Sequence, residues 1–169
     1  MIRDIVRFGD ERLLAENVPV EAGWPELADL LADMKDTCVA APGIGLAAPQ
    51  IGVNRRIAII DLTVGQDPNA LIVLVNPVIV ETSGEQKEEE GCLSVPDLTE
   101  RVVRPAHVRV RASDASGAER EIEGTGLLAR ALCHEIDHLN STLYIDRLRG
   151  LKRELTKKKL ERRAARGLL

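Results

Sequence analysis

The chain has 169 residues, of which 44% are apolar and 30% charged, and its formal net charge is −4 at neutral pH. This composition provides enough apolar material for a folded core and excludes wholesale disorder and low-complexity scaffolds. Proteins that mainly coat nucleic acid neutralise phosphates with cations and stack bases on aromatic rings. The net negative charge and the single Trp, Tyr and Phe disfavour that class.

The cysteines and the apolar runs indicate the compartment. The three cysteines, Cys38, Cys92 and Cys133, are odd in number and contain no Cys-x-x-Cys pair, so a disulfide framework is not expected. The N-terminal residues lack a signal-peptide core, and apolar runs such as 71–75 are far too short to cross a bilayer. We therefore expect a soluble cytoplasmic protein without membrane contacts, folded as a single domain over residues 1–169.

The first ninety residues contain one clear helix and several strand patterns. Apolar residues at helical spacing, with a proline near the start, predict a helix over 25–40. The Gly- and Pro-rich segment 43–52 has few polar residues, which favours a buried or half-buried loop. The glutamate-rich stretch 81–90 is predicted to be a solvated connection. The remaining predicted elements are a short helix at 10–15 and strands at 56–62, 71–75 and 78–81.

The second half of the chain contains a hairpin and two helices. Segments 107–113 and 119–123 alternate polar and apolar residues around a turn, which predicts a β-hairpin. The helix predicted over 125–141 is apolar on more than one side and should be buried on more than one side. Residues 150–166 form a basic amphipathic pattern typical of a helix. Short strands and a few helices without regular alternation favour an α+β fold.

The motif His134-Glu135-Ile136-Asp137-His138 lies in the buried helix. Residues four apart share a helix face, so both imidazoles can bind one metal ion. Glu135 projects in a different direction, where it could act as a general base on a metal-bound water. The alternative is a chance pair of helical histidines, but burying two histidines and a glutamate without a partner is costly. The motif therefore favours a metal site.

The third metal ligand has several candidates. His107 begins an alternating strand and is expected to be an exposed strand residue, and Asp146 is the nearest acid downstream. Cys38 and Cys133 are expected to be small core residues. Cys92 lies in a glycine-containing loop, and a thiolate approaching two histidines from a loop completes a sound tetrahedral set.

Three motifs occur in a characteristic order: GIGLAAPQ at 43–50, EGCLS at 90–94 and HEIDH at 134–138. Together they resemble the peptide deformylase family, in its bacterial, iron-dependent form, from about residue 3 to the C-terminal helix. The resemblance implies an α+β fold in which antiparallel sheets pack around a central metal-binding helix, followed by a C-terminal helix. It also implies that the single domain is catalytic.

The resemblance implies a reaction and a metal. Cys92, His134 and His138 would bind one divalent ion, usually Fe²⁺, which Zn²⁺, Ni²⁺ or Co²⁺ can replace, with water as the fourth ligand. The reaction is hydrolysis of the N-formyl group from the initiator N-formylmethionine of nascent polypeptides, which releases formate. The metal-bound water would be the nucleophile, and Glu135 would take its proton and deliver it to the leaving amine.

The resemblance also assigns the substrate contacts. The side-chain amide of Gln50 and the backbone N–H of Leu93 would donate to the developing oxyanion. Gly45 would hydrogen-bond the substrate main chain. The methionine pocket would be lined by Ile44, Ala131 and the aliphatic part of Arg130, with Leu128 as either a pocket or a core residue.

Further expectations concern residues around the site. Asp137 faces away from the metal side of its helix, and we expect it to form a structural ion pair with Arg104. Thr99 stands where some family members carry an arginine. The basic C-terminal helix, residues 150–169, could dock on ribosomal RNA or could be a solvated face that covers the sheet.

Two other classes of protein remain open on the sequence. One is a small His-Glu-x-x-His zinc protease, whose third ligand would be Glu or His rather than Cys92. The other is a non-catalytic, metal-bound peptide-binding module, which would not need Glu135.

Overall fold

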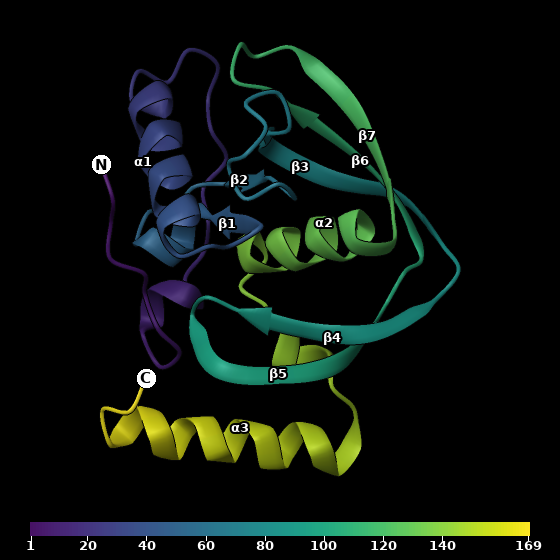
Figure 1. Ribbon diagram of the computed structural model, residues 1–169. Coiled ribbons are helices and arrows are strands. Elements are labelled where there is room, and N and C mark those ends of the chain that lie inside the picture. The colour runs from purple at the N-terminus through teal and green to yellow at the C-terminus, as the bar shows by residue number, and fades with distance from the viewer.

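The computed structural model describes residues 1–169. Helix α2 (Gly126–Leu139) lies between a five-stranded sheet and a separate two-stranded sheet (Figure 1). The larger sheet has the strand order β1-β2-β3-β6-β7, and every neighbouring pair in both sheets is antiparallel. The predicted α+β architecture, with antiparallel sheets packed around a central helix, is confirmed.

The elements follow the chain with short connections. The larger sheet consists of β1 (Gly45–Ala47), β2 (Ile57–Ile60), β3 (Ile72–Ser83), β6 (His107–Ser113) and β7 (Glu119–Thr125). The smaller sheet consists of β4 (Gln86–Cys92) and β5 (Val95–Arg104), and the other helices are α1 (Leu27–Ala40) and α3 (Gly150–Ala165). Three 3₁₀ turns complete the chain: η1 (Glu11–Leu13), η2 (Ala48–Ile51) and η3 (Tyr144–Arg147).

Helix α2 is buried over nearly its whole length, from Ala129 to Leu139, as its apolar pattern predicts. One side packs on the larger sheet, and the other faces the smaller one (Figure 1). Helix α1 covers a second cluster around Met34, and α3 contributes Leu160 to a third cluster beneath β5. None of the helices combines the length and the apolar character needed to span a membrane.

The prediction of a solvated connection over 81–90 is wrong. Strand β3 continues to Ser83, and β4 begins at Gln86. In β4 successive side chains point to opposite faces, so Glu89 is exposed while Glu90 is buried. Glutamates on the solvent face hide the strand pattern in the sequence. Strand β5, which pairs with β4, is not predicted from the sequence either.

Two other predictions differ in detail. The predicted strands 71–75 and 78–81 form one strand, β3. The break between them is a bulge, at which Asn76 adopts a positive φ of 52° and the register shifts between Val75 and Val78. Segment 43–52 is buried as predicted, but it contains strand β1 and turn η2 rather than an irregular loop. The short helix predicted at 10–15 is the 3₁₀ turn η1.

Candidate metal centre and active site

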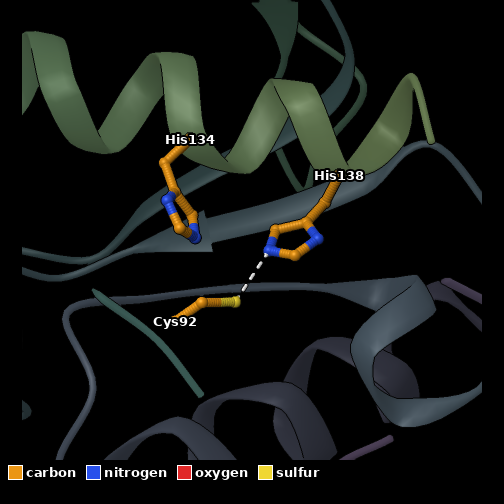
Figure 2. Close-up of side chains that lie close together, drawn as sticks. All are labelled: Cys92, His134 and His138. Carbon is orange, nitrogen blue, oxygen red and sulfur yellow. Dashed lines mark hydrogen bonds between the residues drawn. The ribbon is translucent and has the colours of Figure 1, made fainter. Parts of the chain in front are cut away.

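Cys92, His134 and His138 come together as the sequence predicts. One ligand atom from each lies within 4.8 Å of the others, and the Cys92 Sγ is 3.3 Å from the His138 Nε2. Figure 2 shows the two imidazoles pointing from α2 toward the thiol, which lies at the end of β4. The helical spacing of the histidines places their ring centroids 5.0 Å apart. A thiolate with two imidazoles is a donor set that fits zinc or ferrous iron.

The surroundings orient one imidazole and keep the other neutral. The Nδ1 of His134 lies 2.6 Å from the Glu90 Oε2, which leaves Nε2 as the free ring nitrogen. A carboxylate on the outer nitrogen is a common way to orient a metal-binding histidine. Burial lowers the pKa of His138 well below its usual value, so this imidazole is neutral, the form that binds metals.

Glu90 is a site residue that the sequence reasoning missed. It is buried and accepts two hydrogen bonds from Arg104, at 2.6 and 3.1 Å, and one from Arg130 at 2.8 Å. Burial alone would raise its pKa, but the hydrogen bonds from His134 and Arg104 hold it at about 2. Its place two residues before Cys92, inside the EGCLS motif, was the available signal.

The predicted ion pair between Arg104 and Asp137 is confirmed. The Arg104 Nη1 donates to the Asp137 Oδ2 at 2.6 Å, and both side chains are buried. Asp137 also accepts from Arg147 at 2.7 and 3.0 Å. Helix α2 is therefore held from two directions on the side away from the metal ligands.

Glu135 lies on the wall of a cavity, with a free carboxylate oxygen. Its side chain is buried, its Oε2 has no hydrogen-bond partner, and burial raises its pKa to about 7. A Cβ on Gly45 would lie 2.7 Å from the Glu135 Oε1. The carboxylate therefore packs against bare backbone, and the glycine is required by this close approach.

The amide of Gln50 lies beside the metal ligands. Its Oε1 accepts from the Ala47 N–H at 2.9 Å, while its Nε2 donates to the Ser94 Oγ at 3.1 Å and lies 3.6 Å from the Cys92 Sγ. These bonds fix the amide with its donor end toward the thiol. Leu93, the second predicted donor residue, directly follows Cys92.

A cavity of about 740 Å³ opens onto this site. Leu128 does not line it and packs against the main core, whereas the exposed Leu127 does line it and was not predicted. Glu135 and His134 lie on its wall. The predicted substrate-contact residues Ile44, Gly45, Gln50, Leu93, Arg130 and Ala131 all line this cavity.

The other candidate ligands lie elsewhere. His107 begins β6 as a half-buried strand residue, and Asp146 accepts from the Leu143 N–H and pairs with Lys157. Cys38 and Cys133 are buried core residues, as predicted. None of the four belongs to the cluster of metal-ligating atoms.

Comparison with known proteins identifies the family. A family model described as polypeptide deformylase matches residues 2–154. The peptide deformylases of Acidobacterium capsulatum and Thermodesulfovibrio yellowstonii are each 46% identical to this chain, covering 96% and 95% of it and 95% and 97% of their own lengths. Among solved structures, a peptide deformylase from Legionella pneumophila is 48% identical with a TM-score of 0.88, covering 96% of this chain and 95% of its own. The peptide deformylase of Thermus thermophilus is 36% identical with a TM-score of 0.91, covering 98% of this chain and 97% of its own. The chain therefore belongs to the polypeptide deformylase family.

Proposed function

We propose that this protein is a metal-dependent peptide deformylase, which hydrolyses the N-formyl group from the initiator N-formylmethionine of nascent polypeptides and releases formate. The observation that carries the proposal is Glu135, a buried, unpaired carboxylate on the cavity wall, adjacent in sequence to His134 of the Cys-His-His cluster. A peptide-binding module would gain nothing from burying such a group. Residues 1–169 act as one catalytic domain, and with three free cysteines the cytoplasm is the proposed compartment.

Cys92, His134 and His138 are the proposed metal ligands, for one Fe²⁺ per chain, with Zn²⁺, Ni²⁺ or Co²⁺ as substitutes. When bound, the metal polarises the formyl carbonyl and lowers the pKa of the attacking water. Cys92 argues against the zinc-protease alternative, because it takes the place where such a protease would have Glu or His.

Glu135 moves the proton in the proposed mechanism. With a pKa of about 7 it can accept a proton from the attacking water near neutral pH and later donate it to the leaving amine. The backbone of Gly45 blocks one side of the carboxylate, so its motion is restricted. Its free oxygen has no protein partner to compete with the water.

Gln50 and Leu93 are the proposed donors to the oxygen that becomes negative in the transition state. The Gln50 amide is already held by Ala47 and Ser94, so it needs little reorganisation. The backbone N–H of Leu93 is the second donor. Removal of one such donor costs about 10²–10³ in rate.

The cavity is the proposed substrate site. The Gly45 backbone would pair with the substrate main chain, because β1 is the edge strand of the larger sheet and only its β2 side is already paired. The methionine side chain would fit among aliphatic groups, which suits a chain with three aromatic residues. The proposed pocket residues are Ile44, Ala131 and the aliphatic part of Arg130, together with Leu93.

We further propose that the basic C-terminal helix, residues 150–169, docks on ribosomal RNA. Its buried side chains, Thr156 and Leu160, face the protein, and most of its basic residues are exposed. The alternative is that this face is only solvated. Ribosome co-sedimentation should weaken with added salt and with removal of the Lys157–Lys159 charges. Binding that survives both changes would exclude docking through this helix.

The test of the proposed function is formate release from N-formylmethionyl peptides by protein purified anaerobically with Fe²⁺. We expect turnover by the wild type and its loss in Glu135→Gln, which should retain the metal. An inactive, iron-loaded wild type would contradict the proposal. A Cys92→Ser protein with full metal content and activity would favour a protease-like ligand set instead.

A further inference from the structure

The two sheets of the protein share no ladder of backbone hydrogen bonds. Strands β4 and β5 pair only with each other, and α2 lies between them and the larger sheet (Figure 1). Cys92 is at the end of β4, whereas His134 and His138 are on α2. The spacing between the thiol and the imidazoles therefore depends on side-chain contacts between the hairpin and the helix.

Glu90 receives two of these contacts, and both come from the same face of α2. The Arg130 Nη1 donates to Oε1 at 2.8 Å, and the His134 Nδ1 lies 2.6 Å from Oε2. Arg130 and His134 are four residues apart, one helical turn, so they reach the carboxylate side by side. Because Glu90 lies two residues before Cys92, this double attachment holds the helix next to the thiol.

Arg130 also reaches the second strand of the hairpin. Its Nη2 donates to the Val102 carbonyl of β5 at 3.0 Å, so one guanidinium joins α2 to both strands. Arg130, Glu90 and His134 are all buried. Charge-assisted hydrogen bonds between such buried groups are stronger than those at the surface.

We propose that Arg130 is a positioning residue for the metal centre, which holds Cys92 at ligand distance from the two histidines by tying α2 to the hairpin through Glu90 and Val102. The inference rests on the metal site of the proposed function. This positioning role belongs to the guanidinium and is distinct from the proposed contact between the aliphatic part of Arg130 and the methionine side chain. Arg104 also bonds Glu90, but it lies on the hairpin itself and reaches α2 through Asp137, on the side away from the ligands.

The test compares Arg130→Met with Arg147→Met. Methionine keeps an aliphatic stem and removes the guanidinium. Arg147 makes a comparably short pair with Asp137 at 2.7 Å, but its side chain is half exposed and its hydrogen bonds go only to Asp137 on α2, so it serves as a control for the loss of a guanidinium–carboxylate pair that does not involve the hairpin. The readout is the Zn²⁺ dissociation constant of each folded protein, measured by competition with a chromophoric chelator, alongside thermal unfolding of the metal-free proteins.

We expect Arg130→Met to weaken Zn²⁺ binding by about tenfold or more, because it removes a bond from Glu90, the outer partner of His134, and disturbing such an outer partner typically costs about 10–100-fold in metal affinity. Arg147→Met should stay within about threefold of the wild type, and Arg130→Lys, which can keep one hydrogen bond, should recover part of the loss. Equal Zn²⁺ affinities for Arg130→Met and Arg147→Met would overturn the proposal. If Arg130→Met does not fold, Arg130→Gln replaces it under the same criterion. Zn²⁺ affinity requires no turnover, so failure of this inference is distinct from failure of the deformylase assay.

Discussion

The backbone of Gly45 lies directly against the carboxylate of Glu135, so that a Cβ at Gly45 would be 2.7 Å from Oε1 and 3.1 Å from Cδ. This contact joins β1, on the edge of the larger sheet, to the side of α2 that carries Glu135. It explains why a glycine is needed at this position although its φ is not positive.

Gly45→Ala should therefore displace either the Glu135 carboxylate or β1. Because a shift of about 1 Å in a catalytic group can cost about 10²-fold in rate, we expect a fall of that order in kcat/KM. The atoms nearest to such a Cβ all belong to Glu135 and none to Cys92, His134 or His138, so metal content should not change. Formate release together with metal analysis checks this prediction, and an alanine variant with wild-type turnover would show that the contact is not restrictive.

Arg104→Met should destabilise the fold strongly. It leaves Glu90 and Asp137 buried without their shared cation, and breaking a buried pair costs about 3–5 kcal/mol. The control is Arg109→Met, which removes a partly exposed pair with Glu81 at 2.6 Å and should cost about 0–1 kcal/mol. Urea unfolding of both variants measures the difference, and equal costs would contradict the account.

Glu90 should also give the metal-free protein a distinct acid transition. Its pKa is about 2 in the folded chain and near 4.5 when unfolded, so it stabilises the fold above about pH 4.5. That contribution is lost as the pH falls from about 4.5 toward 2. Relative to the wild type, Glu90→Gln should unfold at lower denaturant concentration at neutral pH, with the difference shrinking across this window. A constant difference between the two proteins from pH 7 to pH 2 would argue against the assignment.

Thiol labelling should distinguish the three cysteines. Burial raises the pKa of Cys38 to about 12 and that of Cys133 to about 11, so neither should react near pH 8 in the folded chain. Metal-free protein should therefore label once, at Cys92, and a bound metal should protect that thiol. Mass spectrometry counts the labels. Labelling of Cys38 or Cys133 without unfolding would contradict this prediction. Labelling of Cys92 in the metal-loaded protein would contradict it as well.

The proximity of His134 and His138 is predictable from the sequence because residues four apart share a helix face whatever the rest of the fold does. Cys92 is harder, since it reaches the histidines only through the packing of β4 against α2. The order of the three motifs points to Cys92 through the family resemblance, whereas residue spacing alone leaves the third ligand undecided. The burial of α2 is equally predictable, because its apolar residues occupy more than one face.

Glu90 is not predictable from local pattern. It follows two exposed glutamates, and its partners Arg104 and Arg130 lie 14 and 40 residues away in the chain. Only the fold brings these charges together. The continuity of β3 is also not predictable from local pattern. Asn76-Pro77 is typical of a turn, but in the fold these residues form a bulge inside the strand.

The central claim is that Cys92, His134 and His138 hold the metal that supports deformylation. X-ray absorption of the anaerobic, Fe²⁺-loaded protein measures the ligand set directly. The account predicts one sulfur and two imidazole nitrogens around each iron, with the sulfur lost in Cys92→Ser. An iron site without sulfur in the catalytically active wild type would contradict it.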